Sequence, residues 1–179
     1  DDCTWGMFCD KNYWEARQED SVSLEEEAEK YLRLNNLALE NAPEDLVITT
    51  HVCRGNYHST WASSGGYEPI APFLFANENV SAYYLEFDDE RSGGFEPLRF
   101  VSDDKKVVLG LVTSKSPILE EKEVIKKRIA KAAKYIPLDR LYLSPQCGFA
   151  SCEIGNKLTE EEQWAKLALV KDIAKEVWG

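Results

Sequence analysis

Apolar segments of strand length alternate with amphipathic segments of helix length along most of this 179-residue chain. The strand-like segments cover about residues 46–51, 81–87, 107–112 and 140–144. The helix-like segments cover about residues 23–41, 67–77, 116–136 and 159–177. Strands that alternate with helices form parallel sheets, because each helix returns the chain to the starting edge of the sheet. The pattern predicts an α/β fold of about four βα units with parallel strands, half the number in a (β/α)8 TIM barrel.

Local signals predict where several of these helices begin and what lies between the elements. The segments Ser23–Glu26 and Thr159–Glu162 have the form of capping boxes, in which side chains satisfy free backbone N–H groups of the first turn. Ser116–Pro117 is expected to begin a third helix, because proline fits the first helical turn. The paired glycines within residues 88–97 predict a loop there, because glycine disfavours both regular structures.

Four residues with metal-binding side chains occupy the ends of the strand-like segments. His51 and Cys53 close the first segment, Glu86 ends the second, and Cys147 follows the fourth. In βα proteins, ligands bind at the carboxyl ends of the strands, so these residues are expected to meet at one edge of the sheet. Imidazole, carboxylate and two thiolates are the ligand types that zinc takes in tetrahedral sites. The sequence therefore predicts a zinc site.

Composition limits the class of protein. A chain of 179 residues fits a single domain over 1–179. Its net charge of −11 excludes nucleic acid as an expected partner. We find no apolar stretch near the roughly 20 residues of a membrane span, which predicts no membrane partner and a cytoplasmic location. The odd count of five cysteines favours a reducing compartment, with Cys3, Cys9 and Cys152 as structural or free thiols.

The segments that carry the candidate ligands resemble the catalytic domain of cobalamin-independent methionine synthases, most closely the shorter, single-domain proteins of that family. The resemblance lies in Thr50–Cys53, Leu85–Glu86, Thr113–Pro117 and Leu141–Gly148. It implies the C-terminal half of a TIM barrel, with zinc held by one histidine, one glutamate and two cysteines. On this chain the implied ligands are His51, Cys53, Glu86 and Cys147.

The resemblance also implies substrate-binding residues. The family has an acidic pair directly after a strand whose first aspartate holds the amino group of homocysteine, and Asp1-Asp2 looks like that pair. The first four βα units would then be missing, so we expect either a missing N-terminal half of the barrel or self-association. Where larger synthases have a histidine that delivers a proton to the leaving group, this chain has Lys115, our candidate catalytic residue. An amine with a pKa near 10.4 is a poor proton donor at pH 7 unless it is buried.

The function expected from this reading is zinc-dependent methyl transfer to homocysteine, giving methionine. The methyl donor would be methyltetrahydrofolate or a related compound. Zinc would deprotonate the thiol and hold its sulfur for attack, and Glu86, an oxygen ligand among softer ones, is the ligand expected to weaken when the thiol enters. Two alternatives stay open at this stage: zinc-dependent alkyl transfer to another thiol such as coenzyme M, and a non-catalytic paralogue with a structural zinc.

Three further expectations concern residues near the strand ends. The acidic run 88–90 is expected to lie in a solvated loop, with Arg91 as an ion-pair partner. His58 and Trp61 lie in a loop where an exposed residue is commoner than a functional one. Side chains on the inner side of a half barrel, with Val47 and Leu85 expected among them, would lack a covering layer.

Overall fold

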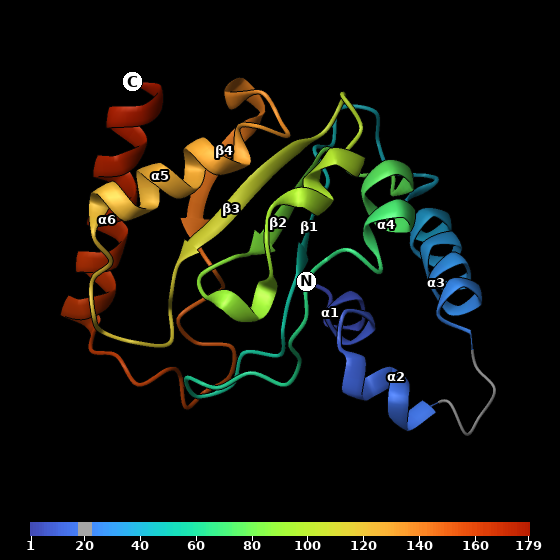
Figure 1. Cartoon of the computed structure of the whole chain (residues 1–179), viewed down its shortest axis with the longest axis horizontal. Coiled ribbons are helices and arrows are strands. Elements are labelled where there is room, and N and C mark those ends of the chain that lie inside the picture. The colour runs from blue at the N-terminus through green and yellow to red at the C-terminus, as the bar shows by residue number, and fades with distance from the viewer. Residues whose placement is uncertain (18–22) are drawn as a thin grey trace.

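A four-stranded parallel sheet forms the centre of the computed structural model, which describes residues 1–17 and 23–179 (Figure 1). The strands lie side by side in chain order: β1 (Thr49–Val52), β2 (Ala82–Glu86), β3 (Lys106–Val112) and β4 (Leu141–Pro145). The predicted α/β class, the parallel pairing and the number of strands are confirmed. The first strand begins later than predicted: residues 46–48 form no strand, and Val47 among them is 73 % exposed.

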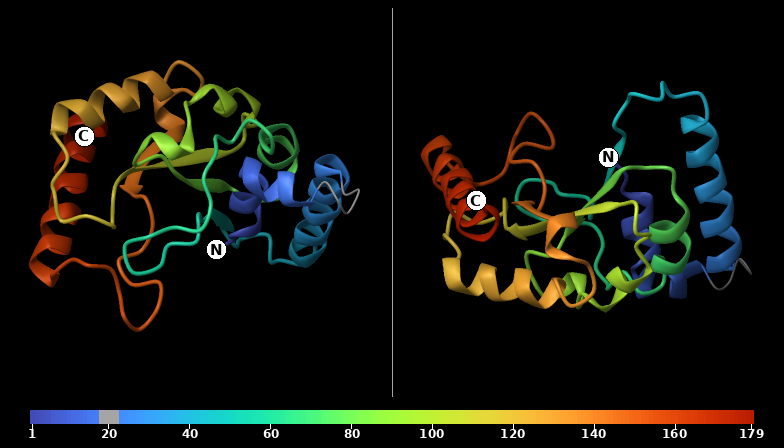
Figure 2. Two further views of the ribbon diagram at one scale, coloured as in Figure 1. Left: turned by 60° about the horizontal axis from the view of Figure 1, so that its bottom comes forward. Right: turned by 90° about the horizontal axis from the view of Figure 1, so that it is seen from above.

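Helices flank the sheet from α3 at one end to α6 at the other (Figures 1 and 2). The α-helices are α1 (Thr4–Phe8), α2 (Lys11–Arg17), α3 (Leu24–Leu39), α4 (Ala71–Asn77), α5 (Lys122–Ala132) and α6 (Glu160–Trp178). The described residues also include the short 3-10 helices Glu90–Ser92, Glu96–Phe100 and Leu138–Arg140. Ser23 caps α3 through the N–H of Glu26, and α6 opens with the complete capping box of Thr159 and Glu162. No helix in residues 1–17 and 23–179 is long and apolar enough to cross a membrane.

The helix expected from Ser116 begins only at Lys122. The preceding segment is held outside a helix by contacts from α6. The fully buried Lys166 pairs with Glu120 at 3.0 Å and donates to the carbonyl of Ile118 at 2.5 Å, while Glu120 accepts the N–H of Thr113 at 2.9 Å. Such bonds occupy groups that a first helical turn would need, so they delay the start of α5.

Side chains alternate between two faces of the sheet. One face, with Tyr83 and Leu85 fully or almost fully buried, packs into the hydrophobic core. The opposite, inner face carries Tyr84 and Tyr142, which are 38 % and 40 % exposed. Leu85 was expected on the inner face, and this expectation was wrong, because Leu85 lies on the face that packs into the core. The neighbouring Tyr84 lies on the inner face instead, since a shift of one residue along a strand moves a side chain to the other face. The open inner face itself is present, and its exposed large side chains include Tyr84 and Tyr142, which flank the buried Val108 in register.

The N-terminus adds backbone pairing beside β1. Asp2 donates its N–H to the carbonyl of His51 at 2.9 Å, and its own carbonyl accepts the N–H of Cys53 at 2.9 Å. These bonds form an isolated parallel bridge between Asp2 and Val52. The chain then turns into α1 and α2, two short helices that the sequence pattern did not predict. The pairing brings Asp1 and Asp2 to the same end of the sheet as His51 and Cys53.

Glu78 is a buried carboxylate in the core, and it gives a testable pH dependence. Burial raises its pKa to about 7 from 4.5, although Asn35 donates to Oε1 at 3.1 Å. The folded state thus binds this proton more tightly than the unfolded state, so its contribution to stability is lost as the pH rises from 4.5 to 7. We expect Glu78→Gln to raise the free energy of unfolding by about 2 kcal/mol at pH 8 and by about 0.5 kcal/mol at pH 5.

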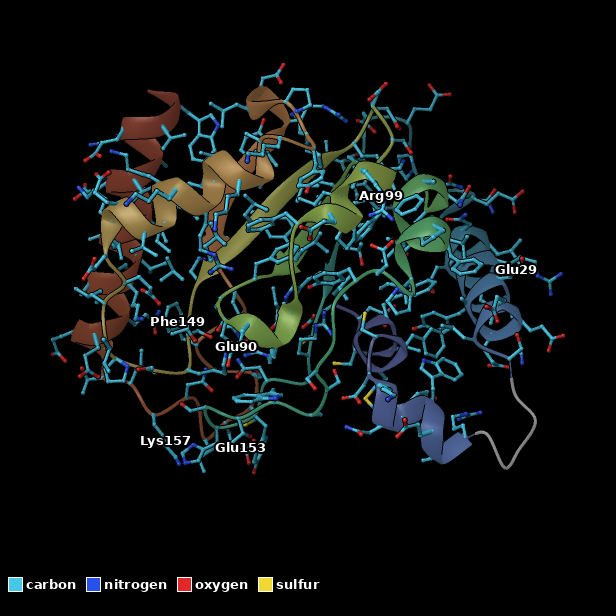
Figure 3. All side chains as sticks on the ribbon, in the orientation of Figure 1. Glu29, Glu90, Arg99, Phe149, Glu153 and Lys157 are labelled. Atoms are coloured by element: carbon cyan, nitrogen blue, oxygen red, sulfur yellow. The ribbon has the colours of Figure 1, made fainter. Side chains whose placement is uncertain are left out.

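Urea unfolding of both proteins at the two pH values measures this difference. Glu29→Gln is the matched control, because Glu29 is exposed on the outer side of α3 (Figure 3). An equal effect of Glu78→Gln at pH 5 and pH 8 would contradict the burial of an ionising carboxylate at this position.

Candidate metal centre

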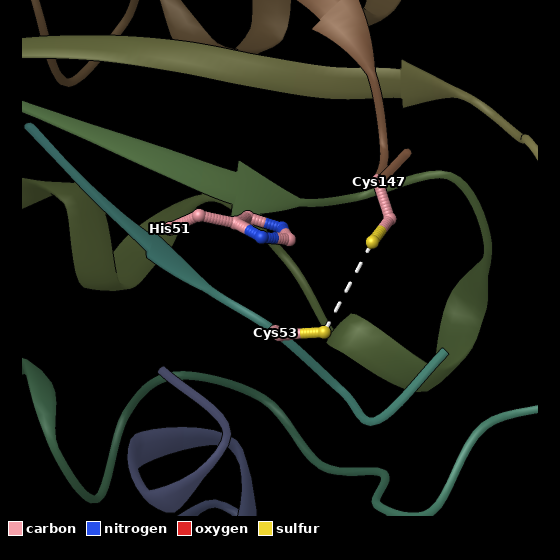
Figure 4. Close-up of side chains that lie close together, drawn as sticks. All are labelled: His51, Cys53 and Cys147. Atoms are coloured by element: carbon pink, nitrogen blue, oxygen red, sulfur yellow. Dashed lines mark hydrogen bonds between the residues drawn. The ribbon is translucent and has the colours of Figure 1, made fainter. Parts of the chain in front are cut away.

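His51, Cys53 and Cys147 meet at the carboxyl end of the sheet (Figure 4). His51 lies within β1, Cys53 follows this strand, and Cys147 follows β4. Their ligand atoms all lie within 4.8 Å of one another, and the Cys53 and Cys147 sulfurs are 4.0 Å apart. Two sulfurs bound at about 2.3 Å to one tetrahedral zinc lie about 3.8 Å apart, so the observed spacing fits such an ion.

Glu86 borders this cluster without being part of it. It is the last residue of β2 and is fully buried, and its Oε1 lies 3.7 Å from Nε2 of His51. Oε1 accepts the backbone N–H of Arg54 at 2.9 Å, and Oε2 accepts from Arg91 at 2.8 Å. Burial raises the pKa of Glu86. Three of the four predicted ligands therefore converge directly, and the fourth lies beside them with other partners.

The orientation of the His51 ring is set by the N-terminus. Its Nδ1 lies 2.8 Å from a carboxylate oxygen of Asp1, and its Nε2 lies 3.1 Å from the carbonyl of Gln146. Because a carboxylate only accepts, Nδ1 carries the proton that it donates to Asp1. A carboxylate in this position fixes the ring of a metal-binding histidine. The Gln146 carbonyl also only accepts, so Nε2 would act as a ligand atom when a metal takes the place of that contact. Sequence reasoning missed this contact, since it assigned Asp1 to substrate alone.

The sulfurs of Cys53 and Cys147, 4.0 Å apart, lie within hydrogen-bonding distance of each other. Their hydrogen bond lowers the pKa of Cys53 well below that of an ordinary thiol and raises the pKa of Cys147. Burial is the largest cause that raises the pKa of Cys3, followed by its neighbour Cys53. Burial also raises the pKa of Cys9 to about 11, which fits the predicted structural role.

A hydrogen-bond network holds the loop that carries Cys147. Gln146 accepts from the N–H and hydroxyl of Ser114 at 2.8 and 2.9 Å. The Gly148 carbonyl accepts from Asn56 at 3.1 Å and from Ser114 at 3.0 Å. Asn156 donates to the carbonyl of Ser114 at 2.8 Å. These contacts join loops far apart in sequence, and no local pattern in the sequence marked them.

Gly110 permits the close approach of β4 at this point. A Cβ atom there would lie 2.7 Å from the Cα of Gln146 and 2.9 Å from the carbonyl oxygen of Leu85. The register between β3 and β4 shifts between Gly110 and Val112. This irregularity re-aims the chain directly before Cys147, as bulges beside functional sites commonly do.

The acidic run after β2 differs from the expected solvated loop. The side chain of Asp88 is only 1 % exposed, and it pairs with Lys115 and, at 3.1 Å, with Arg91. Arg91 also pairs with Asp89 and lies 4.7 Å from the ring centre of Trp61. The ion-pair role expected for Arg91 is present, but Asp88 is not a surface residue. The two cations that pair with Asp88 come from separate segments, because Arg91 precedes β3 and Lys115 follows it. The burial of Asp88 therefore depends on contacts that form only when the chain folds.

The remaining predicted residues lie near the cluster in different roles. Asp2 is bound within the structure: its carboxylate accepts from Tyr31 at 2.9 and 3.0 Å and from the N–H of Thr4 at 2.8 Å. The side chain of Asp1 is 67 % exposed beside His51. Cys152 is half-buried and lies outside the cluster. Asp1 therefore has free carboxylate surface at the site, and Asp2 does not.

The donor set suits a soft divalent metal. Two sulfurs and one imidazole nitrogen select zinc over magnesium or calcium, which prefer oxygen ligands. Catalytic zinc sites hold three protein ligands and keep a position open for substrate. The convergence of His51, Cys53 and Cys147, with Glu86 close by, fits that arrangement.

Comparisons with known proteins agree with this geometry. Residues 14–176 match the catalytic domain of the cobalamin-independent synthases. The chain is 48 % identical over 179 residues to the uncharacterised protein YxjG of Bacillus subtilis, covering 99 % of this chain and 47 % of YxjG. It is 25 % identical over 141 residues to a methionine synthase of Pyrococcus horikoshii, covering 70 % of this chain and 38 % of that protein. The chain thus spans about half the length of the curated relatives it matches.

A solved structure from Listeria monocytogenes, provisionally assigned as a vitamin-B12-independent methionine synthase, superposes with a TM-score of 0.76 at 40 % identity. The match covers 99 % of this chain and 47 % of that one. The half-barrel interpretation of the four parallel βα units is confirmed by this superposition. The match over residues 14–176 shows that the chain belongs to the cobalamin-independent synthase catalytic-domain family, a family of methionine-synthase-like methyltransferases.

Proposed function

We propose that this chain carries the zinc site of a thiol methyltransferase, which transfers a methyl group to homocysteine to give methionine. The observation that supports this most is the meeting of one imidazole and two thiols within 4.8 Å at the carboxyl end of the sheet. We assign His51, Cys53 and Cys147 as metal ligands and Glu86 as the fourth. When bound, zinc supplies deprotonation of the substrate thiol near neutral pH.

The chain's own residues would prepare this chemistry. Asp1 accepts from Nδ1 of His51 and so holds the ring that presents Nε2. The sulfurs of Cys53 and Cys147 lie 4.0 Å apart, and the hydrogen bond between them lowers the pKa of Cys53, which favours its thiolate form as a ligand. The buried Gln146 and Ser114 fix the loop of Cys147 and help to exclude water from this side of the site.

For the acceptor we propose an amino-acid thiol. An amino group needs an anionic partner, and the exposed carboxylate of Asp1 offers one beside His51. Asp2 was also a candidate, but Tyr31 and Thr4 already occupy its oxygens, so we assign this role to Asp1. Coenzyme M is the alternative acceptor, and its sulfonate would need a cation in the place that Asp1 occupies.

For the methyl donor we propose methyltetrahydrofolate or a related compound. Lys115 stays our candidate catalytic residue, in an electrostatic role, because its ammonium pairs with the buried Asp88 close to the proposed site. A cation at this position is suited to stabilising negative charge on the leaving group. The activity of the whole protein also rests on the other half of the barrel or on self-association, because the chain covers 47 % of YxjG.

Cobalt(II) in place of zinc tests the proposed site, because thiolate ligands give cobalt an intense charge-transfer absorption. We expect the chain to bind one cobalt(II) with a spectrum of two thiolates, and homocysteine to add a third. Coenzyme M and methionine serve as comparison ligands. A spectrum that no thiol changes would favour the remaining alternative, a closed structural metal site.

A further inference from the structure

The carboxylate of Glu86 is held by two partners inside the protein. Oε1 accepts the N–H of Arg54 at 2.9 Å, and Oε2 accepts from Arg91 at 2.8 Å. The side chains of Glu86 and Arg91 are 0 % and 6 % exposed. A charge-assisted hydrogen bond between buried groups is among the stronger ones in proteins. One of the two oxygens of this candidate ligand is therefore taken by an arginine.

Arg91 is the fixed member of this pair. Its guanidinium pairs with Asp89 and, at 3.1 Å, with Asp88, and the ring of Trp61 lies 4.7 Å away on its other side. The side chain of Arg91 is only 6 % exposed, whereas Trp61 beside it is 48 % exposed. Among the side chains of residues 1–17 and 23–179, Glu86 has only Arg91 as a hydrogen-bond partner, with His51 farther off at 3.7 Å. The Arg91 guanidinium is thus held by more contacts than the Glu86 carboxylate, so we take the carboxylate as the group that changes position.

On the basis of the proposed zinc site, we propose that Arg91 is a positioning residue that makes Glu86 a replaceable metal ligand. With Oε2 held by Arg91, only Oε1 faces His51 and the two thiols. When a substrate thiolate takes the place of Glu86, the carboxylate keeps a cationic partner within the protein. Without Arg91 the displaced carboxylate would be a buried charge with only the N–H of Arg54 as a partner and no cation beside it, which is unfavourable.

The test compares Arg91→Gln with the unchanged chain in the cobalt(II) form, titrated with homocysteine. We expect the affinity for homocysteine to fall about tenfold, within the range found when an outer contact of a metal ligand is lost. Zinc affinity, measured by competition with a chelator, is expected to stay equal or to rise, because the freed Glu86 can bind metal without a competing cation. Arg91→Lys, which keeps the charge, should restore most of the homocysteine affinity.

Two controls separate positioning from loss of structure. Arg99→Gln removes an arginine that pairs with Glu68 on the surface, away from the site, and should change neither affinity (Figure 3). In a Glu86→Gln background, Arg91→Gln should have no further effect on homocysteine binding, because the interaction that it breaks is already absent.

A fall of more than about tenfold in zinc affinity for Arg91→Gln would overturn the inference in favour of a structural role. An unchanged homocysteine affinity in that variant, with normal binding in the unchanged chain, would overturn the inference and leave the proposed function standing. A chain that binds cobalt(II) but shows no response to homocysteine would overturn both.

Discussion

Cys147→Ser is expected to abolish zinc binding by this chain at micromolar metal. Cys147 supplies one of only two sulfurs within the cluster, and its sulfur lies 4.0 Å from that of Cys53. A serine hydroxyl stays protonated and is a far poorer zinc ligand than a thiolate. Loss of an outer contact alone costs about 10–100-fold in metal affinity, so loss of a ligand should cost more. Metal content after dialysis, measured by atomic emission, gives the result directly.

Cys152→Ser is the matched control for this experiment. Cys152 lies five residues beyond Cys147, is half-buried in the same part of the chain, and is outside the three-residue cluster. It should keep zinc at the level of the unchanged chain. Equal loss of zinc in the two variants would mean that the substitutions disturb the loop and that Cys147 is not a ligand.

The convergence of the candidate ligands was predictable because it depends on two simple regularities. Strands that alternate with helices run parallel, so residues at their carboxyl ends share one edge of the sheet. His51, Cys53 and Cys147 each close or follow such a strand, and the structure places them within 4.8 Å. Their chemistry was equally visible, since few other functions need imidazole and thiol groups together at the carboxyl ends of strands.

The parts that escaped prediction all depend on contacts between distant segments. Lys166 on α6 pairs with Glu120, and this contact delays the start of α5. Lys115, which follows β3, pairs with the buried Asp88, which precedes β3. The bond from His51 to Asp1 joins residues 50 positions apart. Patterns of apolar spacing report which face of an element is buried, but they do not report which charged side chains meet there. This explains why Asp88, in an acidic run that reads as solvated, became part of a buried ion-pair cluster.

The open inner face leads to the second large expected effect, which concerns turnover. In a complete barrel, inward side chains pack in layers contributed by all eight strands. Here Tyr84 and Tyr142 are 38 % and 40 % exposed, and in residues 1–17 and 23–179 no strand pairs with β4 on its outer edge. Exposed sheet edges favour association with another chain. In addition, Asp1 is the one residue of this chain that we propose to bind the amino-acid part of homocysteine.

We therefore expect the 179-residue chain to self-associate and to show no measurable methyl transfer to homocysteine, even with zinc bound. Joining it to the part of YxjG that lies outside the match should cover the inner face and restore turnover, because that relative is about twice as long. Size-exclusion chromatography and a methylation assay on both proteins measure the two effects, with the Cys147→Ser form of the joined protein as the inactive control. A monomeric 179-residue chain with full activity would contradict the half-barrel account of the site, since one carboxylate and an open sheet would then suffice to bind and orient the substrate.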